Sequence, residues 1–378
     1  MMGETISDPT ATFVFVSLGL NPAPTLSLFA QRALEQLPGS RAILVTDRPA
    51  HWDSTFPGSV IRYTGEDRDS AVLMAEKREI SRRLVANGYW ILTLERIFAL
   101  RCAVQQSVSS EPLIHLESDS LSQVNSEVLD QLKARCSKIA VPSDAPGSGC
   151  ASILFAPNAD SLRQGLDELS TLLGRQTEWI SDMELLGLGI DAGLVEELPT
   201  RPSMGWTIPP KTGSTAPRLL IFDALALGLY LFGRDPLHTD GEILGGYQHA
   251  RFEVELNTWE WRLRASEGPK PRRYTVEGST APFTSILPGN LHVHSKELIP
   301  EINPESEYWS RLLDEANGLT ARTARTGISP YRFQRLPIWK RVVFFQSKTR
   351  SEKRDLVRAL LRKVLRAILV RRDRRRKW

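Results

Sequence analysis

The sequence predicts an α/β fold, with a mixed and mainly parallel sheet flanked by helices. A β-rich run over 12–18 is followed by a segment with helical spacing over 26–36 and a second strand at 42–45. This β-α-β opening is typical of parallel strands that are joined by right-handed crossovers. A helical segment over 90–104 then leads into a short apolar strand at 113–116, which reads as buried.

The later segments continue to alternate between helical and extended patterns. Ser181 is predicted to cap a helix, because acidic residues follow it in the first turn. Residues 196–217 are rich in Pro, Thr and Gly, which predicts a loop. The other predicted elements are helices over 122–135 and 160–173, strands within 147–155, 252–264 and 273–276, and a mostly buried segment over 219–232.

Composition limits the class of protein. The 378 residues are 41% hydrophobic and 24% charged, which is ordinary for a soluble globular chain with a large core. Cys102, Cys136 and Cys150 are too few and too far apart for a zinc cluster or a disulfide framework, and they indicate reduced thiols in a cytoplasmic protein. We expect no signal peptide, and the longest apolar run, 219–232, is too short to span a bilayer.

Two carboxylates follow the apolar strand at 113–116. Glu117 and Asp119 fall at its carboxyl end, where open α/β sheets place their ligand clefts. Side chains at i and i+2 of an extended backbone point the same way, so both carboxylates can reach one hard cation. Proteins usually bind Mg²⁺ or Mn²⁺ on nucleotides through one or two carboxylates and the phosphate oxygens. A strand that leads into a solvated loop would carry the same residue types.

The segment 290–296 is the second chemical motif. In an extended strand it places His292, His294 and Lys296 on one side. An imidazole can bind a metal ion, and Lys296 can place a positive charge against a phosphate. A solvated edge strand is the ordinary explanation for any one of these residues taken alone.

Together these features resemble a GT-A fold glycosyltransferase, in particular the bacterial surface-polysaccharide members. The features are the Glu-x-Asp pair, the small residues from Gly147 to Phe155, the acid at a helix start and the His-x-His-x-Lys strand. The resemblance extends in order over roughly residues 12 to 300. It implies a Rossmann-like GT-A domain that binds a nucleotide-sugar donor and a divalent metal ion, Mn²⁺ or Mg²⁺.

The resemblance also implies a role for individual residues. The implied metal ligands are Asp119, Glu117, His294 as the late histidine and His292 as its second choice, and the implied donor-binding residues are Glu117, Asp119, Ser148 and Lys296. Family members commonly have Asp at the first metal position, where this chain has Glu117. Asp119 can therefore bind the ion directly while Glu117 acts through water or the ribose.

Asp182 is the residue that the resemblance implies as the general base of an inverting reaction. An acceptor hydroxyl is a poor nucleophile, so a positioned carboxylate must take its proton. Asp223 is the alternative base, and Asp240 is a further rival. The helix dipole would favour an acid at position 182 without any catalytic role.

Three polar residues near the first motif have simpler interpretations. His115 lies inside the apolar strand and is predicted to be a core histidine with its hydrogen bonds satisfied. Arg96 and Arg101, on the preceding helix, are predicted to be surface or ion-pairing residues rather than phosphate-binding residues.

The carboxyl-terminal segment differs in charge from the rest of the chain. Residues 340–378 carry a net charge of +13, which leaves −9 for residues 1–339. Apolar residues from Leu356 to Ile368 recur with helical spacing beside Arg and Lys, which predicts a basic amphipathic helix attracted to anionic lipid. Binding to nucleic acid, an oligomer contact and packing on the main domain are the alternatives.

These observations give a domain organisation. We predict a GT-A catalytic domain over 1–335 and a basic amphipathic tail over 336–378. Within the domain, about 12–155 form the donor nucleotide half and 156–300 the acceptor half.

The predicted function is metal-dependent transfer of a sugar from a nucleotide-sugar donor to a glycan or lipid-linked acceptor. The predicted location is cytoplasmic, with peripheral attachment to the inner face of the membrane, and no nucleic-acid partner is expected. The alternatives are a nucleotidyltransferase of sugar phosphates and a non-catalytic, nucleotide-sugar-binding membrane scaffold. A nucleotidyltransferase typically has a basic Gly-rich loop after its first strand, whereas residues 19–25 contain no Lys or Arg.

Overall fold

The computed structural model describes a set of ranges that all belong to the compact unit Met1–Ala321. The described residues are 10–19, 26–82, 89–107, 110–210, 218–224, 227, 260–265, 274–280 and 284–292. Asp240, His294, Lys296 and the predicted tail over 336–378 lie outside them. Within these ranges, no helix is both long enough and apolar enough to cross a membrane.

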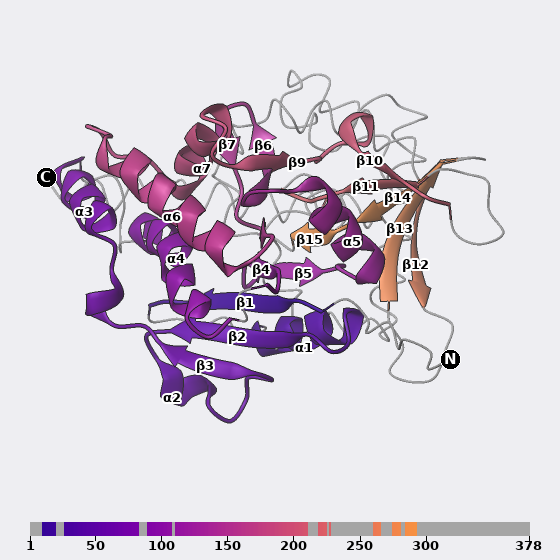
Figure 1. The fold of residues 1–378 in the computed structure, drawn as a ribbon, viewed down its shortest axis with the longest axis horizontal. Helices are drawn as coiled ribbons and strands as arrows, with labels where there is room; N and C mark the ends of the chain where they lie inside the picture. Colours follow the sequence, from indigo (N-terminus) through magenta and orange to yellow (C-terminus); the bar gives the residue numbers. More distant parts are fainter. Residues whose placement is uncertain are drawn as a thin grey trace, which may run out of the picture. The chain divides into compact units, whose positions relative to one another are not determined.

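An eight-stranded mixed sheet forms the centre of this unit (Figure 1). Its strands are β1 (Thr12–Ser17), β2 (Arg41–Thr46), β3 (Ser59–Arg62), β4 (Leu113–Leu116), β6 (Ala140–Ala145), β7 (Ser148–Gly149), β8 (Ile153–Ala156) and β9 (Glu196–Leu198). The order is β3-β2-β1-β4-β8-β6-β7, with β9 beside β6. The first four strands are parallel, and β8 runs antiparallel to β4. The predicted α/β class with a mixed, mostly parallel sheet is confirmed.

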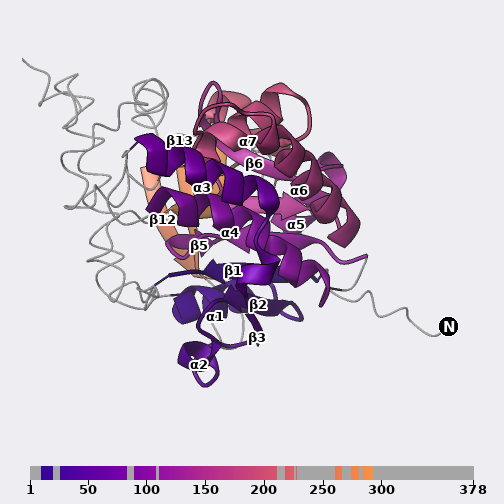
Figure 2. The same ribbon diagram turned by 90° about the vertical axis from the view of Figure 1, so that its left-hand side faces the viewer.

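Helices cover both faces of this sheet because successive strand residues point to opposite sides. Val14 and Val16 of β1 pack toward one group of helices, whereas Phe13 and Phe15 pack toward the other. The first group is α3 (Ser70–Arg82), α4 (Tyr89–Val104), α6 (Ala159–Gly174) and α7 (Asp182–Asp191), and the second is α1 (Leu26–Gln36), α2 (Pro49–Trp52) and α5 (Ser126–Arg135). Three of these helices, α3, α4 and α6, pack side by side and face the viewer in Figure 2.

Two smaller sheets follow. A five-stranded sheet has the order β10-β11-β14-β13-β12, and a two-stranded sheet joins β15 to β5. The bounds are β5 (Ser120–Ser122), β10 (Trp206–Ile208), β11 (Arg218–Ile221), β12 (Glu260–Ala265), β13 (Tyr274–Thr280), β14 (Thr284–Pro288) and β15 (Asn290–His292), with single 3₁₀ turns η1 (Gly65–Asp67) and η3 (Pro202–Met204). Since β15 pairs with β5, a late segment of the chain lies beside the end of β4.

Several predicted boundaries are exact or nearly so, and others are wrong. The helix over 26–36 is found as predicted, but the helix predicted over 122–135 begins only at Ser126. The Asn125 side chain caps it by accepting a hydrogen bond from the Val128 N–H at 3.0 Å, and β5 occupies the residues before it. The loop predicted over 196–217 contains β9, η3 and β10 in its described part, because tertiary pairing overrides its turn-rich composition.

Candidate active site

The carboxylate pair lies in a turn between β4 and β5. The Glu117 N–H donates to the Ser152 carbonyl at 3.4 Å, and the Ser120 N–H donates to the Glu117 carbonyl at 2.9 Å. Residues 117–120 therefore reverse the chain direction instead of extending it. The expectation that an extended backbone aligns the two carboxylates is wrong, and a tight turn brings them together instead.

His292 faces both carboxylates. The antiparallel pairing of β15 with β5 places it opposite Ser120, next to Asp119. Its Nε2 lies 3.5 Å from Glu117 Oε2 and 3.3 Å from Asp119 Oδ1. Its Nδ1 donates to the Ala224 carbonyl at 3.0 Å, which fixes the ring and directs Nε2 toward the acids. Residues from distant parts of the sequence thus converge at the carboxyl end of β4.

The surroundings of His292 favour its charged form. Burial alone would lower the pKa of this imidazole, but the Asp119 carboxylate raises it well above its ordinary value of 6.5. Cys150 and Glu117 act in the same direction as Asp119. The imidazolium therefore partly offsets the negative charge of the two carboxylates.

Arg96 of α4 supplies a second positive charge. Its Nη2 contacts Glu117 Oε1 at 2.5 Å, so the two oxygens of Glu117 face Arg96 and His292 respectively. Of the two interpretations of Arg96, a surface residue or an ion-pairing residue, the structure has the ion pair, and its partner is a predicted metal ligand. Arg101 forms ion pairs with Asp69 and Asp167, as predicted.

Asp182 lies at the amino terminus of α7, beside Arg96 and Glu117. Ser181 caps the helix by accepting from the Glu184 N–H at 3.2 Å, and Glu184 accepts from the Ser181 N–H at 2.7 Å, which confirms the predicted cap. Thr93 Oγ1 donates to Asp182 Oδ1 at 3.1 Å. Burial raises the pKa of Asp182, Arg96 opposes this, and Glu117 adds to it.

Cys150 borders the same cluster. One ligand atom each from Glu117, Cys150 and His292 lie within 4.8 Å of one another, and all three residues are buried. The Cys150 thiol donates to the Ala224 carbonyl at 2.9 Å, and burial raises its pKa to about 11. A protonated thiol is a poor ligand for Mg²⁺ or Mn²⁺, which prefer oxygen.

The Asp223 carboxylate holds two backbone segments near the site, at His292 and at Leu227. Its Oδ2 accepts from the His292 N–H at 2.8 Å, and its Oδ1 accepts from the Leu227 N–H at 3.0 Å. The residue is 1% exposed. Both carboxylate oxygens of the alternative base therefore hold backbone amides next to the site.

Ser148 and His115 occupy other positions. Ser148 lies in β7 against α7, and a Cβ on Gly187 would come within 2.5 Å of the Ser148 nitrogen. His115 is buried inside β4, and its Nδ1 donates to the Val14 carbonyl at 3.0 Å. Among the described residues, its Nε2 has no hydrogen-bond partner. The ring was predicted to have both nitrogens hydrogen-bonded, and only Nδ1 is. Burial lowers the pKa of His115 to about 3.

The donor set fits a divalent cation. Glu117 and Asp119 offer carboxylate oxygens. His292 offers Nε2 once that nitrogen has released its proton, because its other nitrogen is bonded to a carbonyl. Such a mixture of oxygen and imidazole nitrogen suits Mn²⁺ and similar ions. A divalent cation also supplies more positive charge to the two carboxylates than the single proton on His292.

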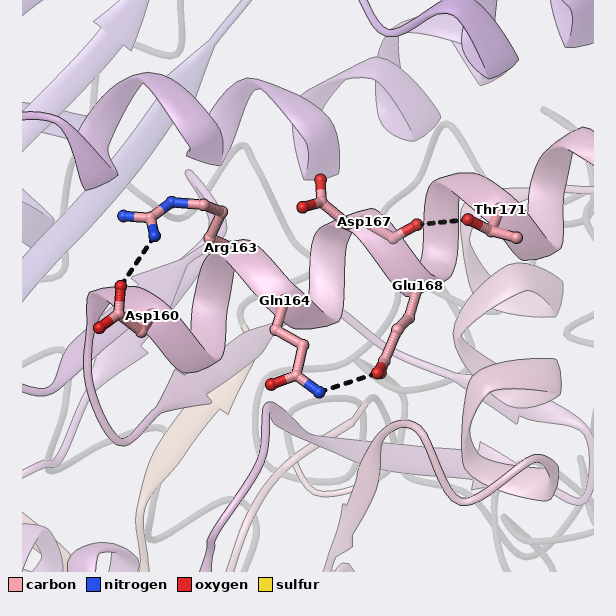
Figure 3. A pocket seen from close by; sticks show the side chains of 6 residues that line it. All are labelled: Asp160, Arg163, Gln164, Asp167, Glu168 and Thr171. Carbon is pink, nitrogen blue, oxygen red and sulfur yellow. Dashed lines mark hydrogen bonds and ion pairs between the residues drawn. The ribbon is translucent and has the colours of Figure 1, made fainter.

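A hollow of about 450 Å³ lies elsewhere, on the exposed side of α6 (Figure 3). Its polar side chains mostly pair within the helix, as with Arg163 and Asp160 at 2.8 Å and Gln164 and Glu168 at 2.9 Å. Thr171 Oγ1 donates to the Asp167 carbonyl at 2.9 Å. This hollow differs from the site at β4, because all the residues that line it belong to the single helix α6.

The chain is similar to several solved glycosyltransferase structures. Mouse xyloside xylosyltransferase 1 is 11% identical with a TM-score of 0.30, over 50% of this chain and 85% of that chain. The glycosyltransferase GlyE of Streptococcus pneumoniae TIGR4 is 12% identical with a TM-score of 0.39, over 81% and 63%. The galactosyltransferase LgtC, in complex with donor and acceptor sugar analogs, is 14% identical with a TM-score of 0.33, over 51% and 76%. No protein-family model and no curated protein sequence matches the chain.

Proposed function

We propose that this protein is a metal-dependent glycosyltransferase that moves a sugar from a nucleotide-sugar donor to an acceptor hydroxyl. The observation that carries the proposal is the convergence of Glu117, Asp119 and His292 at the carboxyl end of β4. Ligand sites of open α/β sheets lie at this end of the strands. The three groups are buried or nearly so, and burying two carboxylates costs free energy unless positive charge offsets it.

The proposed metal ligands are Asp119 and His292, with Glu117 held between Arg96 and His292. When bound, a divalent cation stabilises the negative charge that develops on a diphosphate leaving group. Arg96 orients Glu117 through the contact at 2.5 Å. His294, Lys296 and Ser148 remain predictions for the outer part of the donor site.

Asp182 is the proposed general base of an inverting reaction. The bond between the sugar's anomeric carbon and the diphosphate breaks, and its electron pair leaves with the nucleoside diphosphate. The acceptor oxygen forms the new bond to that carbon, and its proton passes to Asp182. Burial raises the pKa of Asp182, and a carboxylate with a raised pKa is a stronger base. Asp223 is less suited to this role, since both its oxygens hold backbone N–H groups.

The experiment that tests the proposal is a hydrolysis screen of nucleotide sugars. The full-length chain would be incubated with each donor and Mn²⁺, and release of the nucleoside diphosphate would be followed. We expect slow hydrolysis of one donor or a few, lost on chelation and in Asp119→Asn. Asp160→Asn is the matched control, because Asp160 lies on α6 with a 72% exposed side chain. Release of pyrophosphate from sugar phosphate and nucleoside triphosphate would instead identify a nucleotidyltransferase.

The acceptor is proposed to be a glycan or a lipid-linked saccharide at the inner face of the membrane. The support is the charge of +13 and the apolar periodicity of residues 340–378. A chain that lacks residues 350–378 should remain in the supernatant when it is sedimented with vesicles containing anionic lipid. Full-length protein that ignores such vesicles at low salt would contradict the membrane proposal.

A further inference from the structure

The side chain of Asn290 is buried between the segments that form the candidate metal site. It lies in β15, two residues before His292, and none of its surface is exposed. Within the segment 290–296, only the His and Lys residues were predicted to have a chemical role, and Asn290 was given none. Its position nevertheless makes it the point where three other segments meet.

The amide of Asn290 uses both its acceptor and its donors. Its Oδ1 accepts from the Asp223 N–H at 2.9 Å, and its Nδ2 donates to the Asp223 carbonyl at 3.0 Å. Its Nδ2 also lies 3.1 Å from Ser120 Oγ and 3.3 Å from Ser152 Oγ. The side chain thus pairs with the Asp223 backbone as a neighbouring strand would, while its N–H groups reach two serines.

Each of these contacts adjoins one part of the metal site. Ser120 directly follows Asp119 and closes the turn that holds the carboxylates. The Ser152 carbonyl accepts the Glu117 N–H at 3.4 Å, and the Ser152 hydroxyl donates to the Asp223 carbonyl at 2.6 Å. The Asp223 carboxylate in turn accepts the His292 N–H at 2.8 Å.

We propose that Asn290 is a positioning residue, whose amide holds the Glu117–Asp119 turn and the His292 strand at the spacing that a metal ion requires. The inference rests on the proposed function for its metal. Asn is the residue type that this role needs: an aspartate keeps the acceptor and loses both donors, and a leucine of similar size loses both functions. Partners that orient metal ligands typically change metal affinity by about 10- to 100-fold when they are mutated.

The test is Mn²⁺ binding to the full-length chain without donor, measured by electron paramagnetic resonance and calorimetry. Asn290→Asp should retain a cooperative thermal transition, bind Mn²⁺ about 10- to 100-fold more weakly, and alter the spectrum of the bound ion. A loss of stability alone would leave that spectrum unchanged. Asn158→Asp is the matched control: Asn158 caps α6 only as an acceptor from the Ser161 N–H at 2.8 Å, which an aspartate preserves.

Three outcomes overturn the inference. If Asn290→Asp folds and binds Mn²⁺ with the wild-type affinity and spectrum, this inference is wrong. The proposed function is not affected, since the metal site then forms without the Asn290 amide. If Asn290→Asp does not fold, the deciding variant is Ser120→Ala, which removes the hydroxyl that accepts from the Asn290 amide beside Asp119. Unchanged Mn²⁺ affinity and spectrum in Ser120→Ala would overturn the inference as well. A wild-type chain that binds no Mn²⁺ overturns the metal site of the proposed function together with this inference.

Discussion

The cluster at the end of β4 and the hollow on α6 are both rich in charge, but they are built differently. On α6, Arg163 pairs with Asp160 three residues away, and both side chains are more than half exposed. At β4, Glu117, Asp119 and His292 come from a turn and a distant strand, and Arg96 comes from a helix. Local pairs need only helix geometry. Convergent buried charges need a whole tertiary framework, and they support a function where they also lie at a strand end that can bind a ligand.

The buried Asp69, whose side-chain partners lie on α4 and α6, gives a second comparison with the cluster at β4. Asp69 is buried, yet Arg101 contacts it, the Ser170 hydroxyl donates to it at 2.8 Å and the Ala71 N–H donates at 2.8 Å. One acid thus has a cation and two neutral donors. At β4, two acids share the imidazole nitrogen of His292, and Arg96 also contacts Glu117. The Asp69 network joins three helices, whereas the β4 cluster lies at the carboxyl end of a strand, where open α/β sheets bind their ligands.

The largest expected effect concerns Asp182. Asp182→Asn should lower turnover by about a hundredfold or more and leave donor affinity nearly unchanged, because a general base acts in the transition state. Steady-state kinetics together with calorimetry on the donor would separate the two quantities. Near-normal turnover in this variant would transfer the role to Asp223 or Asp240.

A loss of stability is expected when Asp69 is replaced. Asp69→Ala removes the acceptor of a buried network that joins α3, α4 and α6, and should lower the free energy of unfolding by about 3 kcal/mol. Urea denaturation measures this change. Mn²⁺ affinity should stay at the wild-type value, and a parallel loss of metal binding would erase the distinction between the two charged regions.

The pH dependence of stability should carry a contribution from His115. Because burial lowers its pKa to about 3, the folded chain stays neutral there while the unfolded chain binds a proton below pH 6.5. Stability therefore falls as pH decreases from 6.5 toward 3, by up to about 1.4 kcal/mol per pH unit from this group. His115→Leu should show a correspondingly shallower slope in urea denaturation at successive pH values. Identical slopes in both chains would contradict the neutral, buried state of His115.

The smallest effect is expected on α6. Arg163→Ala removes an exposed i, i+3 pair and should change the free energy of unfolding by less than about 0.5 kcal/mol. The same urea experiment applies, with Asp69→Ala as its reference. A loss as large as that of Asp69→Ala would show that the hollow on α6 is more than a set of local pairs.

Local patterns predicted much of the fold and part of the site. The helix over 26–36 and the strand that precedes Glu117 follow from residue periodicity, which depends on neighbours in sequence. The short strand β5 was missed, because three residues have too little pattern and its formation depends on pairing with β15.

The arrangement of the site depends on tertiary contacts even more than the fold does, so less of it could be predicted. Glu117 and Asp119 could be proposed from their spacing and residue types, whereas the family resemblance implied His294 first and His292 only as the second choice. The structure brings His292 to the carboxylates through the register of β15 against β5, which no local pattern specifies. Arg96 was expected to be a surface or ion-pairing residue, and its partner could not be known from helix spacing. Asn290 gave no signal at all, because its role exists only where three segments meet.

The central claim is that Glu117, Asp119 and His292 form one metal site, and Mn²⁺ binding tests it most directly. Electron paramagnetic resonance of free Mn²⁺ during titration of the wild-type chain, Asp119→Asn and His292→Gln gives the affinity in each case. We expect a single ion per wild-type chain and a loss of at least about tenfold in each variant, with Asp160→Asn unchanged. If His292→Gln binds Mn²⁺ as the wild type does, the histidine is no ligand and the account of this site is wrong.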